Sequence, residues 1–400
     1  MRILITGGSG YIASRLSKFL RFHSLDVVTL SQKSLPDEFN IQCQIGQRDN
    51  LLDILIKCKP DIVIHTAWVN SLFLCESQPD YCHRVNVENS IDLIDAIRSV
   101  TPSSKIMFIS SDYVFDGIRG NYSEVDVPSP RTVYGIHKVE VENAIKGSGL
   151  SHLIIRTANV FTRGGKFFDF LFEHLMAGKQ VDAYADAYFT PTYMNYLLDS
   201  LLRMIEKNAE GTFHLAGPQR VSRYQFGIEM ARVLNCDDRL VIPTMRPSGG
   251  PIAYDVSLDS NKVRKFLNNY CPLFSEAVSY ALGRLLYPYF SFLDDRGGIM
   301  GIIQDGDWKE INYVESATGA TRGKHYHNVA REGFFIIDGK VLVTLHYLDN
   351  GLKESFVVSR GDTFCIEPRT VHTFKVLQGA RWINFLSESM KGANTDILRL

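Results

Sequence analysis

A glycine-rich turn near the N-terminus constrains the fold of this chain more than any other feature. The β-branched run Ile3–Thr6 leads directly into Gly7, Gly8 and Gly10, and a helical pattern then covers Tyr11–Phe22. Glycines at these positions permit a tight strand-to-helix turn and let the backbone approach a pyrophosphate at the positive end of a helix. The turn therefore predicts a dinucleotide-binding α/β domain at the N-terminus.

The spacing of apolar runs predicts a doubly wound parallel sheet for the first part of the chain. Short strand-like runs at Val27–Leu30, Ile62–His65 and Ile106–Ile109 alternate with longer helical patterns such as Val87–Arg98. This alternation is typical of a Rossmann-type α/β fold.

After about Tyr289 the pattern changes to closely spaced strands separated by Asp338-Gly339 and Asn350-Gly351 turns. This rhythm predicts an antiparallel barrel. The aromatic segment Leu285–Phe292 indicates a packed junction, and we expect two domains, 1–287 and 288–400. The predicted strands of the second domain are Phe334–Ile337, Val341–Tyr347, Glu354–Val358, Thr363–Ile366 and Trp382–Phe385.

Composition excludes several classes of partner. The 43 basic residues balance the 44 acidic ones, so the bulk positive field of a nucleic-acid binder is missing. The seven cysteines are scattered and form no C-x-x-C pair, which is typical of reduced thiols in the cytoplasm rather than of a disulfide framework. No apolar stretch has the length of a signal-peptide core or a membrane span. We therefore expect a cytoplasmic protein that binds neither nucleic acid nor membranes.

The end of the second predicted strand indicates which dinucleotide is bound. An acid there would accept bonds from the ribose hydroxyls and repel a 2′-phosphate, but the chain has Ser31-Gln32-Lys33 instead. The sequence favours NADP(H) over NAD(H), although an exposed, solvated Lys33 explains it almost as well. The residues expected at the cofactor are Gly7, Gly10, Tyr11, Ile12, Ser31, Lys33 and Lys138.

Three polar residues predict a site that reduces a ketone. Tyr134 and Lys138 are four residues apart and share one face of a predicted helix, and Ser111 follows the strand Ile106–Ile109. Hydride delivery to a ketone leaves an alkoxide that needs a proton, which the Tyr134 phenol can donate if the Lys138 charge lowers its pKa. Ser111 can hydrogen-bond the carbonyl oxygen. A solvated tyrosine beside a lysine is the alternative for Tyr134 and Lys138 taken alone.

These motifs resemble the dTDP-4-dehydrorhamnose reductase family of the extended short-chain dehydrogenase/reductase superfamily over about residues 1–285. The resemblance implies a catalytic triad of Ser111, Tyr134 and Lys138, with Lys138 also holding the nicotinamide ribose and Asn86 completing a hydrogen-bond network. Matching segments are Ser111–Gly117, Tyr134–Lys138, Arg156-Thr157, Gly164–Phe167, Thr190–Thr192, Phe213–Gly217 and Arg246-Pro247.

Two departures from the family pattern are chemically mild, Ser111 in place of threonine and Ala13 in place of a third glycine. Related sugar dehydratases have an Asp-Glu pair where this chain has Asp112-Tyr113, which favours reduction over dehydration. The regulatory partner of methionine adenosyltransferase also resembles these reductases, so a non-catalytic subunit is the alternative.

The second domain carries the spacing of a cupin, Gly319 through His325, His327 and Glu332, followed by His372. Three histidines and one carboxylate suit a divalent metal, with zinc favoured over manganese, iron or nickel. Many cupins are metal-free, and Thr370 and Val376 depart from the second cupin motif. His325 is alternatively a general base, since imidazole titrates near neutral pH.

The order of the two domains resembles bifunctional enzymes of capsular polysaccharide synthesis, in which the cupin epimerises a 4-keto-sugar that the reductase then reduces. Asp294–Gly297 and Arg322–His327 also resemble cupin-type sugar-nucleotide epimerases. The resemblance implies a homodimeric NAD(P)H-dependent reductase of a nucleotide-linked 4-keto-6-deoxysugar with an epimerase activity. The alternative is a monofunctional reductase whose cupin only binds sugar or has a structural role.

Overall fold

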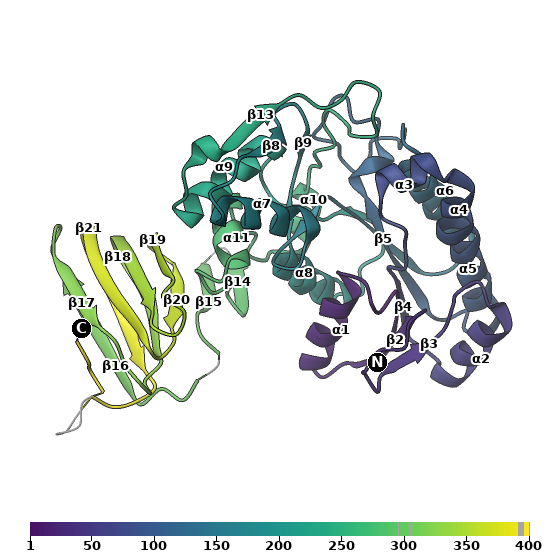
Figure 1. The fold of residues 1–400 in the computed structure, drawn as a ribbon. Helices are drawn as coiled ribbons and strands as arrows, with labels where there is room; N and C mark the ends of the chain where they lie inside the picture. Colours follow the sequence, from purple (N-terminus) through teal and green to yellow (C-terminus); the bar gives the residue numbers. More distant parts are fainter. Residues whose placement is uncertain (295, 305, 391–395, 400) are drawn as a thin grey trace. The chain divides into compact units, whose positions relative to one another are not determined.

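The computed structural model describes residues 1–294, 296–304, 306–390 and 396–399 (Figure 1). The chain divides into two compact units that exchange short segments. The first comprises Met1–Asp169, Asp182–Phe226 and Ile242–Phe274, and the second Phe170–Val181, Gly227–Val241 and Ser275–Leu400. None of the described helices is both long enough and apolar enough to cross a membrane.

The first unit is built on a seven-stranded, entirely parallel sheet, which confirms the predicted Rossmann-like α/β fold. The chain adds strands outward from β1 in one direction and from β4 in the other, so the two halves meet between β1 and β4. Ligands of open α/β sheets bind outside the carboxyl ends of the strands at such a switch point. The strands, in spatial order, are β11 (Gly211–His214), β6 (His152–Thr157), β5 (Lys105–Ser111), β4 (Ile62–His65), β1 (Arg2–Thr6), β2 (Asp26–Ser31) and β3 (Asn40–Gln42).

Helices cover the sheet, and all seven residues of β5 are buried. A strand covered on both faces needs apolar residues at successive positions, which explains the continuous run at Ile106–Ile109. The helices are α1 (Ala13–Phe22), α2 (Arg48–Cys58), α3 (Leu72–Ser77), α4 (Pro79–His83), the π-helical turn η1 (Arg84–Glu88), α5 (Asn89–Val100), the 3-10 turn η2 (Asp112–Val114), α6 (Val133–Gly147), α7 (Lys166–Met176), α8 (Met194–Glu206), α9 (Arg223–Leu234), η3 (Asp238–Leu240), α10 (Asn261–Leu267) and α11 (Phe274–Ala281).

Three short strand pairs complete the part of the chain before the C-terminal sheet. They are β7 (Val160–Phe161) with β10 (Thr192–Tyr193), β8 (Val181–Tyr184) with β13 (Val241–Thr244), and β9 (Tyr188–Phe189) with β12 (Val221–Ser222).

The second unit contains a six-stranded antiparallel sheet, in which β18 and β21 are the longest strands and run side by side (Figure 1). Its core is aromatic and aliphatic, with Phe334, Phe364, Phe374 and Trp382 all buried. Its strands are β16 (Glu310–Ser316), β17 (Thr321–His325), β18 (Glu332–Tyr347), β19 (Lys353–Ser359), β20 (Thr363–Ile366) and β21 (Thr370–Leu386), and a hairpin of β14 (Phe290–Asp294) and β15 (Gly297–Gly301) precedes them.

The predicted turn at Asp338-Gly339 is wrong. The two strands expected on either side of it form one continuous strand, β18, whose pairing with β21 shifts register between Ile336 and Val341. Gly339 has a φ of +86°, and a Cβ there would lie 2.3 Å from the carbonyl oxygen of Gly379. The glycine therefore serves a β-bulge, which bends a long strand, rather than a hairpin.

The segment before the C-terminal sheet is packed against it, as its aromatic composition predicted. Leu285 belongs to the core of the sheet, and the Leu286 N–H donates to the carbonyl oxygen of Thr363 at 2.7 Å. The buried Arg284 guanidinium pairs with Glu354 at 2.9 Å. This part of the second unit is a structured connection.

Candidate functional site

The glycine turn lies where β1 meets β4, and its glycines let the backbone pack closely on itself. Gly7 has a φ of +74°, and a Cβ there would lie 2.8 Å from the Cα of Ala67. The Gly10 N–H donates to the Gly7 carbonyl at 2.7 Å, which closes the turn. At the N-cap of α1, Ile12 offers no side-chain acceptor to the first helical N–H groups. These N–H groups are suited to bind an anion.

Tyr11, Ser31 and Lys33, which are also expected at the cofactor, have different environments. The Tyr11 hydroxyl donates to the Thr162 carbonyl at 3.1 Å, so this ring joins the glycine turn to a later loop. Ser31 is buried and its hydroxyl donates to the Lys33 carbonyl, whereas Lys33 itself is exposed. The structure thus leaves the Lys33 ammonium free to meet either solvent or a phosphate.

Sequence reasoning missed a small cavity of about 280 Å³ at the ends of β2 and β3. A run of glutamines around the second and third strands was the available signal. No charged side chain lines this cavity, so no carboxylate there would repel a ribose phosphate. Its lining residues are Gln32, Gln42, Cys43, Gln44 and Gln47.

The three residues of the predicted reduction site come together at the carboxyl end of β5. Ser111 is the last residue of β5, and Tyr134 and Lys138 lie on α6. The Thr132 hydroxyl caps α6 by accepting from the Gly135 N–H at 3.1 Å, which fixes where the helix begins. The Tyr134 phenol lies close enough to the Ser111 hydroxyl for that hydroxyl to affect its pKa.

The expectation that Lys138 lowers the pKa of Tyr134 is not met in this structure. Burial raises the pKa of the phenol, the Ser111 hydroxyl opposes this rise, and the charge of Asp112 adds to it. Lys138 Nζ lies 5.8 Å from the centre of the Tyr134 ring and donates to the carbonyl oxygen of Ile109 at 2.8 Å. Burial also lowers the pKa of the Lys138 ammonium well below its usual value. For both Tyr134 and Lys138, the cost of removing the charged form from water outweighs the attraction between a phenolate and an ammonium.

Asp112 is a fourth polar group at this site. It is buried and accepts a hydrogen bond from the Ser111 hydroxyl at 2.8 Å. Burial raises the pKa of its carboxyl to about 7, and the bond from Ser111 opposes the rise. Asp112 can therefore change its charge near neutral pH, beside the tyrosine that is expected to donate a proton.

Asn86 is buried in η1 and supports the site through the backbone. Its side-chain oxygen accepts from the Val69 N–H at 2.7 Å, and its amide donates to the Val69 carbonyl at 3.3 Å. The Asn86 carbonyl also accepts from Ser90, whose hydroxyl lies 2.8 Å from His65. The predicted network exists, but it runs to the loop after β4 rather than to the three residues of the reduction site.

A buried ion pair beneath the site was not predicted. Glu142 on α6 pairs with Arg156 on β6, and both side chains are almost fully removed from solvent. The Ser110 hydroxyl donates to Glu142 at 2.6 Å, so the pair is connected to the end of β5. The signal in the sequence was an arginine within the apolar strand Leu153–Thr157.

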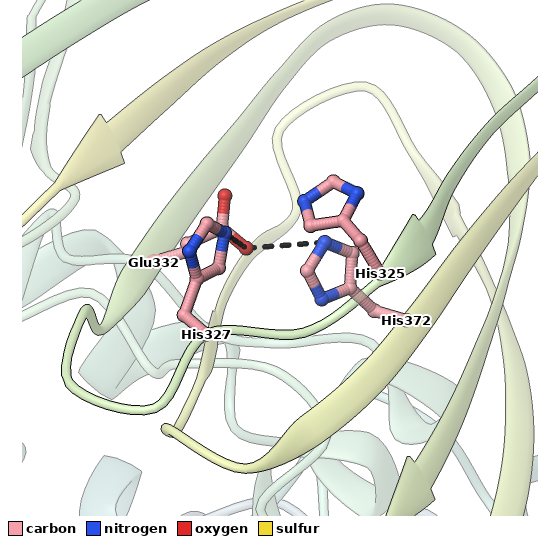
Figure 2. Close-up of side chains that lie close together, drawn as sticks. All are labelled: His325, His327, Glu332 and His372. Carbon is pink, nitrogen blue, oxygen red and sulfur yellow. Dashed lines mark ion pairs between the residues drawn. The ribbon is translucent and has the colours of Figure 1, made fainter. Parts of the chain in front are cut away.

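The second candidate site gathers the four predicted metal ligands in the C-terminal sheet (Figure 2). His325 ends β17 and is opposite His372 on β21, whereas His327 lies in the following loop and Glu332 begins β18. Their ligand atoms all lie within 4.8 Å of one another. Glu332 Oε2 lies 3.1 Å from His372 Nε2 and 3.5 Å from His327 Nε2.

Burial dominates the electrostatics of this cluster. It raises the pKa of Glu332 to about 7 and lowers the pKa of His372 to about 3. His327, Glu332 and His372 are buried, while His325 is partly exposed. Of the string Asp294–Gly297, likened above to epimerases, Asp295 lies outside the described residues, and the other three lie at the β14–β15 hairpin.

The seven-stranded parallel sheet, with its helices, defines a Rossmann-like α/β protein. Residues 1–285 match the family described as RmlD substrate binding domain, and the chain belongs to this dTDP-4-dehydrorhamnose reductase-like family. Residues 292–382 match a second family, described as polysaccharide biosynthesis C-terminal domain.

Two curated relatives represent the two functions considered above, a reductase and a regulatory subunit. The dTDP-4-dehydrorhamnose reductase of Aggregatibacter actinomycetemcomitans is 29% identical over 57% of this chain and 77% of its own. Methionine adenosyltransferase 2 subunit beta of Xenopus tropicalis is 26% identical over 66% of this chain and 82% of its own.

Solved structures show the same fold for the first part of the chain. A hypothetical dTDP-4-dehydrorhamnose reductase of Sulfolobus tokodaii superposes with a TM-score of 0.62 and 30% identity, covering 69% of this chain and 99% of its own. The Bacillus anthracis dTDP-4-dehydrorhamnose reductase in complex with NADP has a TM-score of 0.63 and 23% identity, covering 70% of this chain and 98% of its own.

Proposed function

We propose that this protein reduces a nucleotide-linked 4-keto-6-deoxysugar with NADP(H), preferred over NAD(H), in the biosynthesis of a polysaccharide precursor. The observation that carries the proposal is that Tyr134 lies beside Ser111 at the carboxyl end of β5, with Lys138 one helical turn away on α6. The relatives named as reductases, one of them an NADP complex, support it.

The reaction assigns one task to each side chain. The bound nicotinamide supplies the hydride to the carbonyl carbon. Ser111 hydrogen-bonds the carbonyl oxygen and orients it toward Tyr134, and the Tyr134 phenol gives its proton to the developing alkoxide. Lys138, one helical turn from Tyr134 on α6, would hold the nicotinamide ribose. In the free protein the single Ser111 hydrogen is donated to Asp112, so this hydrogen turns to the carbonyl oxygen when the ketone binds.

Turnover of a panel of substrates tests the reductase. Purified protein is mixed with NADPH or NADH and UDP-, dTDP- or GDP-linked 4-keto-6-deoxysugars, and oxidation of the cofactor is followed by absorbance. Turnover of one sugar names the substrate and supports the proposal. Tight NADPH binding without turnover of any sugar favours a regulatory subunit, as in the methionine adenosyltransferase relative.

For the C-terminal sheet we propose a cupin domain, residues 288–400, that holds a divalent metal, with zinc favoured, and follows a reductase domain of residues 1–287. The donor set fits a metal, because both ring nitrogens of His327 and the Glu332 Oε2 atom are buried without a hydrogen-bond partner among the described residues. Buried polar atoms seldom lack partners. His325, His327, Glu332 and His372 would hold the ion, and a metal there would polarise a sugar oxygen.

We further propose that this cupin epimerises the 4-keto-sugar before it is reduced. A C4 ketone acidifies the C3 hydrogen, so a base can invert C3 only while the ketone persists. His325 is the candidate base because it is the most exposed member of the cluster, although one of its nitrogens cannot bind a metal and accept a proton at once. Deuterium uptake at C3 from D₂O without NADPH would support epimerisation, and its absence, with reduction unchanged in His325→Ala, would support a structural cupin.

From the same resemblance we infer a cytoplasmic homodimer. Sedimentation equilibrium of the purified protein measures this directly, since a dimer has twice the 45.2 kDa mass of the chain.

A further inference from the structure

The Lys138 ammonium is enclosed by two aromatic rings at the end of the sheet. Its Nζ atom lies 3.6 Å from the centre of the Trp68 ring and 4.5 Å from that of Phe108. Its hydrogen bond is made to the carbonyl oxygen of Ile109. A cation over an aromatic face is attracted by the negative potential of the ring, and the attraction is strongest where water is excluded.

The charged groups near Lys138 do not take the place of the attraction between its ammonium and the two aromatic rings. Glu142 favours the ammonium, but it is already paired with Arg156 and with Lys146. Cys75 also faces it, and burial raises the pKa of that thiol to about 12, so it is uncharged near neutral pH.

The remaining titratable neighbours are uncharged as well. Burial lowers the pKa of His65 to about 3, and its two ring nitrogens meet Thr6 and Ser90 at 2.8 Å each. Burial raises the pKa of Tyr134, which keeps this phenol protonated. Among the described residues Lys138 forms no ion pair of its own, so the aromatic faces are what offsets part of the cost of burying its charge.

Trp68 is held in position independently of Lys138. Its ring packs edge-on against Tyr134, with ring centres 6.2 Å apart, and lies 5.7 Å from the ring of Phe108. The next residue, Val69, is clamped through both of its backbone groups by the buried Asn86 side chain. The loop after β4 therefore presents the indole face at a fixed place.

We propose that Trp68 is a positioning residue, whose indole face holds the Lys138 ammonium where it meets the cofactor ribose. The proposal rests on the function proposed above and deepens it, since it assigns to Asn86 and Trp68 the alignment of Lys138. The ring face carries the effect, and the indole N–H, which has no hydrogen-bond partner among the described residues, does not.

Two substitutions of Trp68 distinguish the contribution of its aromatic face from the contributions of its volume and its indole N–H. Trp68→Phe keeps an aromatic face and loses the N–H, whereas Trp68→Leu fills space without one. We expect Trp68→Leu to weaken NADPH binding by about 5- to 30-fold, the range of a desolvated cation–π contact, and Trp68→Phe to stay within about 3-fold of the wild type. Trp308→Leu, just before β16 in the second unit, is the matched control and should bind NADPH like the wild type.

The dissociation constant for NADPH is measured by fluorescence energy transfer to the reduced nicotinamide, after thermal unfolding has shown that each variant is folded. If Trp68→Leu unfolds, Trp68→Met takes its place. Wild-type affinity in the variant without a ring, or equal losses in Trp68→Phe and Trp68→Leu, would overturn the proposal.

A second measurement needs no cofactor. Loss of a proton from Lys138 changes the field at the indole, and burial lowers the pKa of this ammonium, so tryptophan fluorescence of the free protein should show a step at a pH below the usual lysine pKa of about 10.4. This step should disappear in both Trp68→Phe and Lys138→Met. A fluorescence step that persists in either variant, or the absence of a step in the wild type, would contradict the contact between Lys138 and the Trp68 ring. Failure of the wild type to bind NADPH, with the step present, would instead refute the proposed function.

Discussion

Arg156 and Glu142 form a doubly hydrogen-bonded ion pair inside the first unit, with 2.7 Å between Nη2 and Oε2 and 3.0 Å between Nε and Oε1. The exposed fractions of the two side chains are 2% and 0%. Because Ser110 also donates to Glu142, the pair joins α6, β5 and β6 directly behind Ser111. A buried charge in this position destabilises the folded protein unless the opposite charge of its partner is present.

Glu142→Gln should therefore destabilise the protein strongly, because it leaves the Arg156 charge buried without a counter-charge. We expect a loss of about 3–5 kcal/mol in the free energy of unfolding, measured by urea denaturation. Lys146→Met removes the exposed member of the same cluster and should cost less than about 0.5 kcal/mol. Equal losses of unfolding free energy in the two variants would show that the buried Glu142–Arg156 pair stabilises the protein no more than the exposed Lys146 does.

Replacement of Tyr134 tests its role as proton donor. Tyr134→Phe keeps the ring that packs against Trp68 and Tyr113 but removes the hydroxyl that faces Ser111. We expect reduction to fall by about 100-fold or more, in line with the loss of a general acid, while the dissociation constant for NADPH changes little. A large loss of NADPH binding would mean that Tyr134 has mainly a structural role.

The parallel sheet and the residues at its edge could be predicted from the sequence because their signals are local. Gly7 and Gly10 lie within one turn, and Tyr134 and Lys138 lie within one helix. Strand periodicity predicted the α/β class of the first unit and the antiparallel strands of the second, and the histidine cluster followed from motif spacing. The same local signals failed at Gly339, where a positive φ serves a bulge inside β18 instead of a turn between two strands.

The environment of the site could not be predicted, because it depends on residues far apart in the chain. Trp68, Phe108 and Lys138 meet only after β4, β5 and α6 have packed. The directions of the pKa shifts have the same origin. A neighbouring ammonium suggested a lowered pKa for Tyr134, but burial, which the sequence does not reveal, raises it.

The pH dependence of reduction should reflect Asp112. Burial raises the pKa of its carboxyl to about 7, so the group is neutral below this pH and ionised above it. The ionised form binds the Ser111 hydroxyl and raises the pKa of Tyr134, which makes the phenol a poorer acid. We expect kcat to fall as the pH rises above about 7, by up to tenfold per pH unit, following the neutral fraction.

Asp112→Asn cannot ionise and should lose this alkaline decline while it keeps measurable activity at pH 6. A full pH profile of kcat for both proteins makes the comparison. An unchanged decline in the variant would assign the titration to another group.

Removal of the metal should affect the C-terminal unit specifically. His327 and Glu332 present buried atoms without hydrogen-bond partners among the described residues, so an ion that satisfies them stabilises the folded form. We expect purified protein to retain about one equivalent of zinc by elemental analysis, and a chelator to lower the unfolding temperature by several degrees.

His327→Ala should lose the bound metal and the response to the chelator. His346→Ala supplies the matched control, because His346 lies on the same long strand as Glu332 but outside the four-residue cluster. This variant should retain the metal and respond to the chelator like the wild type. If His327→Ala also retained one equivalent of zinc, the ion would lie elsewhere, and the cluster would be a metal-free set of buried side chains.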